Sequence, residues 1–454
     1  MLRETLRRVN AAGQMIWGVG GEISLSRLAA SSSLERDAAE LLGKSLVVLA
    51  DDQLTAALAL IELSGVARRL VLCPPDTPRA QIEVVIAAAE ADAIVIGSQS
   101  PHRGPMFGRA TIRCGPPLAA SSNALAGTAP TEWALLTSGT TGPAKMVLHS
   151  LGALTASFDR LAAPAPAPVW ATFYDIRRYG GLQIFLRAIL GGGSLVLSHA
   201  GESACEHLRR LNEHGVTHVS GTPSHWRRVL MSPDHADFKP RYVRLSGEIV
   251  DQAILDALRH AFPQASIGHA YASTEAGVAF EVTDGKEGFP AEIVGSENGD
   301  VELGVRDGAL CIRSARTASR YLGREAGALK DERGFVLTRD MIERRGDRFF
   351  FVGRGDGVVN VGGLKVHPEE VEAVINRHKD VRMSLVRGRR NPITGEIVVA
   401  DVVLRETHDK GARQLREEIV DLCGHALDAH KIPASIRFVD ALAMSPSGKL
   451  ARHA

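Results

Sequence analysis

The 454-residue sequence has few cysteines, and none of them is paired in a way that would bind a metal or exchange a disulfide. Its five cysteines lie far apart, and no Cys-x-x-Cys motif occurs. This spacing is typical of buried or incidental thiols in a reducing compartment. A disulfide framework and a cysteine-bound zinc site are therefore both disfavoured.

Net charge and long apolar runs are also lacking. The formal net charge of +1 leaves no electrostatic reason to expect nucleic acid or an anionic membrane as a partner. No apolar stretch approaches the roughly 18 residues of a membrane-spanning helix, and Leu54–Leu63 is too short. The charged segment Met1–Arg8 is not followed by the apolar part of a secretion signal. We therefore expect a cytoplasmic protein without a membrane span.

The bulk composition is that of a globular protein, with 45% apolar and 23% charged residues. The length exceeds what one compact core usually holds, so about two or three domains are expected. Glycine is frequent, at 45 residues, which indicates many tight turns and close backbone approaches.

Short apolar runs alternate with helical patterns in the first part of the chain. Ser45–Ala50, Arg69–Cys73 and Ala93–Gly97 are typical of buried strands, and Leu54–Ser64 and Ala80–Glu90 of the helices between them. Strands that alternate with helices in this way indicate parallel sheets covered by helices. We therefore predict an α/β fold.

The pattern changes twice further along the chain. Cys114–Pro130 is rich in Pro, Ala, Ser and Gly and is interpreted as a connection, after which the strand–helix alternation resumes. From about Gly299 the strands become shorter, and Asp356–Ala454 follows the order β-β-α-β-β-α-β. We predict a large N-terminal domain (1–353, with subdomains at about 1–115, 130–290 and 291–353, the last one small and β-rich) and a mobile, small α+β C-terminal domain (354–454).

The strongest motif for chemistry is Thr137-Ser-Gly-Thr-Thr-Gly-Pro-Ala-Lys145, which follows a predicted strand. Glycines let the backbone close around phosphate oxygens, while hydroxyls, amides and a lysine supply donors and charge. The motif lacks the Gly-Lys-Ser/Thr ending of a Walker A loop. It therefore predicts a different kind of polyphosphate-binding loop.

Three weaker motifs follow. Tyr271-Ala-Ser-Thr-Glu275 lies at the end of a predicted strand, where its carboxylate could hold Mg²⁺ and its ring could face a base. Asp340, with Arg354 further on, has the groups that suit ribose hydroxyls or a phosphate. Ser445-Pro-Ser-Gly-Lys449 places a lysine at the tip of a loop near the end of the chain.

Together, in this order and spacing, the four motifs resemble those of the adenylate-forming enzyme superfamily, which includes acyl- and aryl-CoA synthetases, adenylation domains of peptide synthetases, and luciferases. The stretch Gly353–Glu372 (GRGDGVVNVGGLKVHPEEVE) is similarly specific. The resemblance extends over nearly the whole chain. It implies an enzyme in which a carboxylate attacks the α-phosphate of ATP, and a thiol then attacks the acyl-adenylate.

The resemblance also implies roles for particular residues. The phosphate loop would bind the β- and γ-phosphates through Thr137, Ser138, Gly139, Thr140, Thr141 and Lys145. The adenosine site would comprise Ser246, Gly247, Glu248, Tyr271, Ser273, Asp340 and Arg354. Catalysis would rest on Thr274 at the α-phosphate, on Glu275 as the Mg²⁺ ligand and on Lys449 between the carboxylate and the phosphate. The cofactors implied are ATP, Mg²⁺ and either coenzyme A or a phosphopantetheine carrier.

The C-terminal domain is implied to rotate between the two half-reactions, a gating step of a known kind. Asp356 matches the hinge position, and Gly362 and Gly363 would border the thiol tunnel. The chain before the phosphate loop is shorter than is usual in the family, which predicts a trimmed N-terminal subdomain.

The acid pocket is expected to include Phe173, Asp175, Arg178, Gly181, His269 and Ala272. By register, Arg178 falls near a histidine that many acyl-CoA synthetases carry, which puts the gating role of that position in doubt. Arg177 or Arg178 could pair a second anionic group of the substrate, although arginines that are solvated or ion-paired outside the pocket are the more common case. His269 could equally be a packed core histidine.

Several functions stay open on the sequence alone. A free-standing acid–thiol ligase that makes an acyl- or aryl-CoA is the leading interpretation, with a small-molecule carboxylic acid as its substrate. An adenylation enzyme that loads an acyl carrier protein, with an amino acid as a possible substrate, is the close alternative. A kinase or ATPase that uses the same loop would form ADP, and a non-catalytic relative is disfavoured by the presence of Lys449, Glu275, Asp340 and Arg354.

Overall fold

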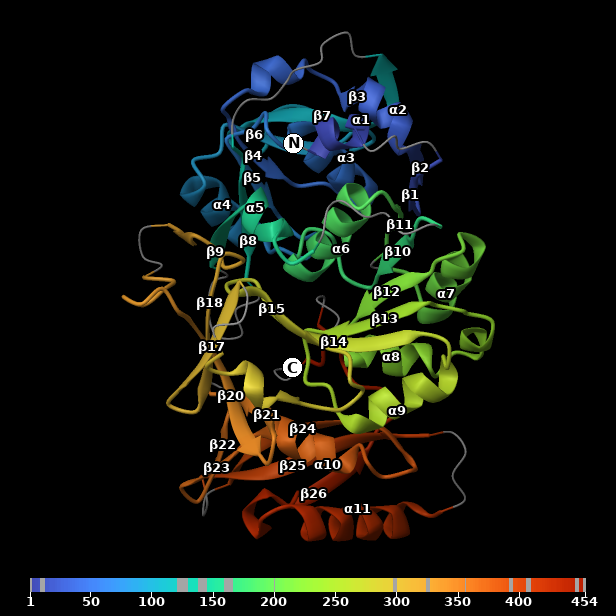
Figure 1. Ribbon diagram of the computed structural model, residues 1–454, viewed down its shortest axis with the longest axis vertical. Helices are drawn as coiled ribbons and strands as arrows, with labels where there is room; N and C mark the ends of the chain where they lie inside the picture. Colours follow the sequence, from blue (N-terminus) through green and yellow to red (C-terminus); the bar gives the residue numbers. More distant parts are fainter. Residues whose placement is uncertain are drawn as a thin grey trace.

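The computed structural model describes residues 2–8, 13–120, 130–137, 145–158, 166–199, 201–296, 300–323, 327–355, 357–391, 395–405, 410–445 and 449–451. Figure 1 shows three regions stacked along the long axis. A sheet from the early chain lies at the top, sheets from the middle of the chain lie below it, and the orange and red C-terminal region lies at the bottom.

The first sheet forms the top of the molecule. It contains β3 (Ser31–Leu34), β4 (Ser45–Val48), β5 (Arg69–Leu72), β6 (Ala93–Gly97), β7 (Ala110–Ala120), β8 (Glu132–Leu136), β9 (Met146–Ser150) and β19 (Arg320–Leu322). Its strand order is β19-β9-β8-β5-β4-β6-β7-β3. The strands from β8 to β7 pair in parallel, and the outer pairs are antiparallel.

The second sheet carries most of the site. It contains β1 (Met15–Gly18), β2 (Gly21–Ser24), β10 (Val169–Thr172), β11 (Ser194–Val196), β12 (His218–Gly221), β13 (Tyr242–Ser246), β14 (Ser266–Ser273) and β15 (Gly277–Val282). Its order is β15-β14-β13-β12-β10-β11-β1-β2, with parallel pairing from β14 to β1. The predicted α/β fold with mostly parallel sheets is therefore confirmed.

The helices fill the space between these two sheets and cover their outer faces. They are α1 (Leu2–Arg8), α2 (Leu25–Ala30), α3 (Gln53–Leu63), α4 (Arg79–Ala88), α5 (Leu151–Thr155), α6 (Tyr179–Leu190), α7 (Ala204–Glu213), α8 (Pro223–Val229) and α9 (Gln252–Ala261). Every residue of α3 is buried, because this helix contacts strands of both sheets and meets α1. A helix that is enclosed on all sides must be apolar all round, which explains its sequence QLTAALALIEL.

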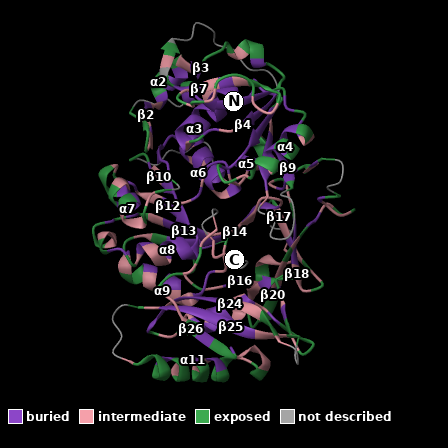
Figure 2. Ribbon diagram, turned by 180° about the vertical axis from the view of Figure 1, so that it is seen from behind, coloured by how far each residue is buried: buried purple, intermediate pink, exposed green. Residues whose placement is uncertain are grey.

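A third, antiparallel sheet joins the large region to the C-terminal one. It contains β16 (Phe289–Pro290), β17 (Val301–Arg306), β18 (Ala309–Ser314), β20 (Val336–Arg345) and β21 (Arg348–Arg354). The C-terminal sheet contains β22 (Val359–Val361), β23 (Leu364–Val366), β24 (Val381–Asn391), β25 (Gly395–Leu404) and β26 (Ser435–Phe438), with α10 (Pro368–Ile375) and α11 (Ala412–Ala426). The predicted order β-β-α-β-β-α-β is confirmed. Figure 2 shows the outer surface of α11 as exposed.

The expected subdomain boundaries do not coincide with the sheets. β8 and β9 lie beyond the expected connection but pair with β5 in the first sheet, and β1 and β2 belong to the second sheet although they precede it in the chain. Segments after residue 130 thus complete the sheet that earlier segments begin. The division into 1–353 and 354–454 stays a prediction.

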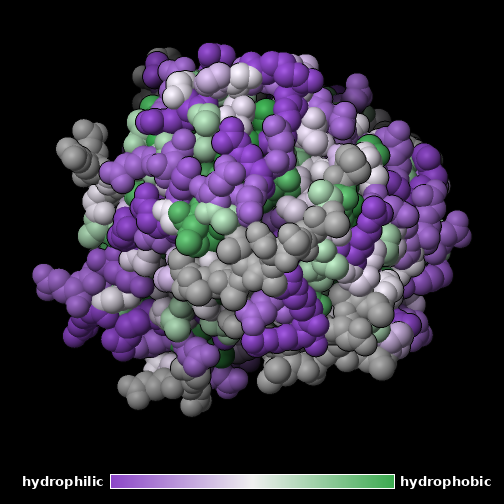
Figure 3. Space-filling view, turned by 90° about the horizontal axis from the view of Figure 1, so that it is seen from above, coloured by the Kyte–Doolittle hydropathy of each residue, from purple (hydrophilic) through white to green (hydrophobic). Residues whose placement is uncertain are grey.

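The surface is mainly polar where it can be seen from above. Figure 3 shows hydrophobic side chains on that face in small groups separated by hydrophilic ones. Among the described residues, no helix combines the length and the apolar character needed to cross a membrane.

Candidate active site

A cavity of about 2240 Å³ lies where the second sheet, the third sheet and the C-terminal region meet. Its walls include the ends of β13 and β14, the residues after β8, parts of β20 and β21, and the loop that carries Lys449. The carboxyl ends of parallel strands are the usual ligand-binding edge of an open α/β sheet. The cavity is therefore the candidate active site.

Most of the residues predicted from the sequence meet in this cavity. Its lining includes Thr137, Lys145, Arg178, Ser246, Gly247, Glu248, His269, Tyr271, Ala272, Ser273, Thr274, Glu275, Asp340, Arg354 and Lys449. These residues come from segments spread over more than 300 positions of the chain, since Thr137 and Lys449 both belong to it. The predictions for Ser138, Gly139, Thr140, Thr141 and Asp356 fall outside the described residues.

Tyr271 and Asp340 form a hydrogen-bonded pair in one corner of the cavity, called the Tyr271–Asp340 corner. The Tyr271 ring stacks on Phe351 with a centroid distance of 5.0 Å, and its hydroxyl donates to the Asp340 carboxylate. Burial, with the negative charge of Asp340, raises the pKa of Tyr271 well above its usual value, so the hydroxyl stays a donor. Asp340 on β20 lies directly opposite Arg354 on β21, which brings an arginine to the same corner.

Glu275 and Lys145 lie at the part of the cavity next to the phosphate loop. Burial raises the pKa of the Glu275 carboxyl above its usual 4.5, and the positive charges of Arg354 and Lys145 act in the opposite direction. The Lys145 ammonium lies over the Tyr321 ring, 5.0 Å from its centroid. A carboxylate that burial makes costly to ionise is stabilised by a cation, so the donor set at Glu275 fits Mg²⁺.

The turn that carries Glu275 is held from behind by a buried histidine. His149 Nε2 on β9 donates to the Thr274 carbonyl oxygen over 2.7 Å. Burial lowers the pKa of His149 to about 4, so the ring is neutral near pH 7. The first and second sheets are thereby connected directly beneath the predicted catalytic residues.

Lys449 enters the cavity on a loop that is anchored to the large region. Leu450 N donates to Glu248 Oε1 over 3.1 Å, while Ser224 N donates to Glu248 Oε2 over 2.9 Å. The Lys449 Nζ lies 3.9 Å from the position that a Cβ on Gly247 would take. Burial lowers the pKa of the Lys449 ammonium below its usual 10.5, and the carboxylates of Glu248 and Asp340 oppose that shift.

Ion pairs at the edge of the interface support the same orientation of the C-terminal region. Arg377 Nη2, just after α10, lies 3.7 Å from Glu287 Oε1, and Arg345 Nη2 on β20 lies 3.9 Å from Glu370 Oε1. Both arginines are about half exposed, so each pair contributes little by itself.

Three residues expected in the acid pocket do not line the cavity. Phe173 is packed against the rings of His225 and Trp226, in the core on the α8 side of the second sheet. The Asp175 carboxylate is paired with Arg177 at 2.6 Å. Gly181 lies against the Asp175 carbonyl, because a Cβ there would come within 2.2 Å of that oxygen. These positions shape the start of α6 instead of the pocket.

The two arginines of this segment already have partners within the chain. Arg177 is buried and donates to Asp175 and to the Ala50 carbonyl oxygen, away from the cavity. Arg178 lines the cavity but donates to both carboxylate oxygens of Asp76 at 2.6 Å. His269 lines the cavity while its Nε2 donates to the Lys286 carbonyl oxygen over 3.0 Å.

Gly362 and Gly363 lie in the exposed turn between β22 and β23, outside the cavity lining. Both have positive φ angles, +61° and +90°, which a glycine adopts without strain. Their predicted role beside a thiol tunnel stays a prediction that requires a different orientation of the C-terminal region.

Tyr174 lies in the segment 173–181 that is expected to form the acid pocket, but the sequence does not single it out as a site residue. Its hydroxyl donates to the Ser246 carbonyl oxygen over 2.7 Å, and its ring lines the cavity. It directly follows Phe173, so attention to the neighbour of a predicted pocket residue could have found it. Ser224, which holds Glu248, had no such signal because its importance comes from a residue 24 positions away.

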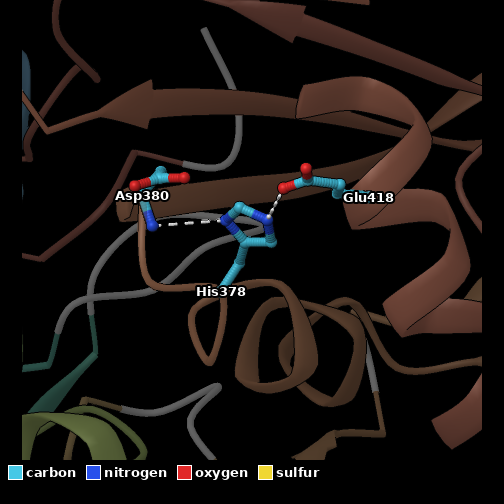
Figure 4. A group of neighbouring side chains, drawn as sticks. All are labelled: His378, Asp380 and Glu418. Atoms are coloured by element: carbon cyan, nitrogen blue, oxygen red, sulfur yellow. Dashed lines mark hydrogen bonds and ion pairs between the residues drawn. The ribbon is translucent and has the colours of Figure 1, made fainter. Parts of the chain in front are cut away.

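A second group of ligand-type side chains lies in the C-terminal region. Figure 4 shows His378, Asp380 and Glu418, with the histidine Nε2 pointing at Glu418 over 3.1 Å. His378 Nδ1 accepts from the Asp380 backbone N–H over 3.3 Å, so the proton of the neutral ring is on Nε2. The Lys410 ammonium pairs with both carboxylates. These side chains therefore form an ion-pair network that links α11 to the residues between α10 and β24.

Comparison with protein families gives two matches. The model described as AMP-binding enzyme matches residues 52–322, and the model described as AMP-binding enzyme C-terminal domain matches residues 370–449. The two matched segments together contain about two thirds of the residues that line the cavity, Lys449 among them, while Asp340 and Arg354 lie between the two segments.

Similar curated proteins are CoA ligases. A 4-coumarate–CoA ligase of Pinus taeda is 27% identical over 284 residues, which are 58% of this chain and 51% of that protein. A 2-succinylbenzoate–CoA ligase of Bacillus subtilis is 25% identical over 339 residues, with 70% of this chain and 67% of that protein covered. The alignments with the 4-coumarate–CoA ligases of Pinus taeda and Arabidopsis thaliana each span about half of those proteins, 51% of their length.

Solved structures show the same fold over the whole chain. A benzoate CoA ligase from Burkholderia xenovorans LB400 has a TM-score of 0.77 at 18% identity, covering 99% of this chain and 98% of that one. An anthranilate CoA ligase in complex with anthranoyl-AMP also has a TM-score of 0.77, at 17% identity, covering 99% and 95%.

Proposed function

Because the chain belongs to the AMP-binding enzyme family, we propose that it uses ATP to activate a carboxylic acid as its acyl-adenylate and then forms the acyl thioester of coenzyme A. The similar CoA ligases support this assignment. An enzyme of the acid–thiol ligase class, which forms AMP, is the function that the geometry supports best.

The observation that carries the proposal is the position of Lys449. A lysine from the end of the chain reaches a cavity that otherwise belongs to the large region, and it lies close to Gly247 and Glu248. The cavity also contains Glu275 and the Tyr271–Asp340 corner. The Lys449 ammonium, the Glu275 carboxylate assigned to Mg²⁺ and the Asp340 carboxylate assigned to the ribose thus line one cavity, as an ATP-dependent activation requires.

In the first step a carboxylate oxygen of the acid attacks the α-phosphorus of ATP. The bond from the α-phosphorus to the bridging oxygen breaks, and pyrophosphate leaves with the electron pair. Lys449 is assigned to stabilise the charge that builds on the carboxylate and the α-phosphate oxygens, an electrostatic role. Thr274 is assigned to the α-phosphate, while Asp340 and Arg354 hold the ribose and Tyr271 borders the adenine.

Thr137 and Lys145 begin and end the loop assigned to the departing phosphates. Lys145 lies in the cavity wall near Glu275, and its positive charge favours the ionised form of the Glu275 carboxyl by lowering its pKa. Mg²⁺ bound at Glu275 would neutralise charge on the pyrophosphate. Positioning the leaving group beside a cation lowers the cost of separating it from the adenylate.

The second step needs a thiol at the acyl carbon. The sulfur attacks as a thiolate, the bond between the acyl carbon and the phosphate oxygen breaks, and AMP leaves. Lys449 and its loop occupy one side of the cavity in the orientation seen here, so we assign this step to a rotated C-terminal region with its hinge at Asp356 and its tunnel at Gly362 and Gly363.

A screen of carboxylic acids with ATP and Mg²⁺ tests the proposal. Pyrophosphate and AMP are expected with at least one class of acid, and coenzyme A is expected to convert the bound adenylate into a thioester seen by mass spectrometry. Formation of ADP would contradict the proposal. If a thioester forms only on the phosphopantetheine of a carrier protein, then the carrier protein and not coenzyme A is the acceptor.

A further inference from the structure

Arg244 differs from the other buried arginines in the described part of the chain. Four arginines have exposed fractions below 10%: Arg69 at 5%, Arg177 at 2%, Arg244 at 4% and Arg348 at 9%. The other three donate hydrogen bonds to carboxylates and carbonyl oxygens. The Arg244 guanidinium makes no hydrogen bond to any described residue, and its Nε is fully enclosed without a partner.

The side chain lies on the face of β13 that leads into the cavity. Successive residues of a strand point to opposite faces, so Arg244 shares a face with Ser246, whereas Val243 and Leu245 belong to the core on the other side. Its neighbours in register are Ser220 and Gly268, both small. Ser246 and its partner Ala270 line the cavity. Arg244 is therefore the next residue inward from the cavity floor.

The positive charge of Arg244 reaches the cavity wall. It acts on the hydroxyls of Tyr174 and Tyr179, both of which line the cavity, and opposes the increase in pKa that burial causes in each. These two tyrosines, at the start of α6 and in the segment before it, therefore lie in the cavity wall and within electrostatic range of the guanidinium. A negatively charged ligand group close to them would be attracted to Arg244.

Among the residues that the structure describes, the positive charge at this place is only partly balanced by carboxylates. The one ion pair of Arg244 is with Glu281, at 3.7 Å, and that carboxylate also accepts from the Tyr242 hydroxyl. A second arginine, Arg187, lies near enough that burial, together with the charge of Arg244, lowers its pKa to about 10. Two arginines thus lie near one carboxylate, and the ion pair with it belongs to Arg244. Burying an uncompensated charge is costly, and such positions are often completed by a ligand of opposite charge.

We propose that Arg244 binds a second carboxylate at the far end of the acid substrate, so that the enzyme prefers dicarboxylic over monocarboxylic acids. This inference rests on the proposed function, because it concerns the same pocket. Arg244 lies two positions before Ser246 on β13, which is a distance of roughly 7 Å along the strand. The second carboxylate would therefore lie at about this depth below Ser246. Arg177 and Arg178 do not compete for it, since Asp175 and Asp76 already pair with them.

The test compares acids that share a carbon skeleton and differ only in the second carboxylate. With the wild-type protein, kcat/KM for pyrophosphate release is expected to be about tenfold or more higher for the dicarboxylic member, the effect of a charged hydrogen bond. Arg244→Met is expected to abolish this preference while it retains pyrophosphate release with the monocarboxylic member. Arg244→Lys should retain part of the preference, and Arg313→Met, an exposed arginine of the third sheet, all of it.

Thermal unfolding gives a readout that does not need turnover. A dicarboxylic acid is expected to raise the unfolding midpoint of the wild type but not of Arg244→Met. Without ligand, Arg244→Met should unfold at the same temperature as the wild type or higher, because a buried charge is removed whose compensation is a single 3.7 Å ion pair. A lower midpoint with an unchanged substrate preference would overturn the inference and make Arg244 a structural partner of Glu281. Absence of pyrophosphate with every acid would instead count against the proposed function, and the ligand-induced shift would still decide on Arg244.

Discussion

At the scale of single residues, the candidate site is built from charges that the fold removes from water. Burial shifts the pKa of Lys449 downward and that of Glu275 upward, so both groups are held in environments that disfavour their charged forms. A bound phosphate beside the lysine and a cation beside the glutamate would reverse these effects. Shifts of this kind are common at catalytic positions.

Replacing Lys449 is the most direct test of the catalytic assignment. Lys449→Ala is expected to lower kcat for adenylation by about 10²–10³, since a charge aimed at the transition state is lost. Pyrophosphate release measures this step. Thioester formation from synthetic acyl-adenylate should change much less. Lys44→Ala, at an exposed position in the first sheet region, is the matched control. Equal adenylation rates for Lys449→Ala and the control would refute the role.

The same lysine predicts a pH dependence. The ammonium form is the active one, and its pKa in the free enzyme is below 10.5. As the pH rises through that lowered pKa, the lysine loses its proton and adenylation should fall, so the alkaline limb of kcat/KM is expected below pH 10.5. A profile for Lys449→Ala without that limb would support the assignment to this group.

Substitutions in the Tyr271–Asp340 corner test its proposed role in binding the ribose of ATP. Tyr271→Phe removes the hydroxyl that donates to the Asp340 carboxylate, and Asp340→Ala removes the carboxylate itself. Hydrogen bonds to charged groups are worth about 1.5–3 kcal/mol, so Asp340→Ala should raise the KM for ATP by at least about tenfold, with a smaller increase for Tyr271→Phe. The KM for the acid should stay nearly constant. An unchanged KM for ATP in both variants would remove Asp340 from the nucleotide site.

At the scale of elements, the site depends on how β9 meets the turn between β14 and β15. His149 on β9 is almost fully enclosed and holds the Thr274 carbonyl. Its pKa is about 4 in the folded protein, against a usual 6.5. Between these values the unfolded chain binds a proton that the folded one does not, so this histidine favours unfolding as the pH falls from 6.5 towards 4.

We therefore expect His149→Gln to make stability less sensitive to acid. In the wild type, this one histidine should cost about 2 kcal/mol between pH 7 and pH 5, and the variant lacks that loss. Urea unfolding followed by tryptophan fluorescence reports on the region, because Trp133 is the partner of His149 in the β8–β9 register. The partly exposed His102 serves as the control position. If His149→Gln had the same loss of stability as the wild type, the titration would belong to other groups, such as His225.

At the scale of the whole molecule, the orientation of the C-terminal region decides whether Lys449 is in the cavity. Gly353 on β21 lies against that region, and a Cβ there would come within 2.6 Å of Glu369 Oε2 and 2.9 Å of His367 Nδ1. Its φ angle of +144° also disfavours other residues. Close contact at this glycine is thus a condition for the orientation that places the lysine.

Gly353→Ala is expected to disfavour this orientation and to reduce adenylation at least about tenfold, because the rate falls in proportion to the population of the competent state and a strain of about 1.4 kcal/mol lowers that population tenfold. Transfer of the acyl group from synthetic acyl-adenylate to coenzyme A should fall much less. Gly357→Ala is the matched control, since the nearest atom to its added Cβ would be 3.9 Å away. An equal loss in both half-reactions would point to misfolding instead of reorientation.

The order of elements in the C-terminal region was predictable because its strands and helices have clear local patterns and short connections. The strand β7 was not, since Ala110–Ala120 contains Gly115, Pro116 and Pro117 and overlaps the segment interpreted as a connection. β1 and β2 were missed as well, because both are short and β11, which joins them to the second sheet by pairing with β1, lies about 180 residues further along. Pairing over such distances leaves little mark on the local sequence.

The amino-acid sequence by itself determined the family and the α/β fold, and it predicted site residues in the phosphate loop, the Tyr271–Glu275 motif, Asp340 and Lys449, because each of these depends on residue type and spacing within a short segment. Only the tertiary structure decided which arginines have hydrogen-bond and ion-pair partners. Arg177 and Arg178 donate hydrogen bonds to carboxylates, whereas Arg244 has only a 3.7 Å ion pair with Glu281 and an Nε without a hydrogen-bond partner. The reason is physical: the state of a buried charge is set by the groups that folding brings around it, and those groups come from distant parts of the chain.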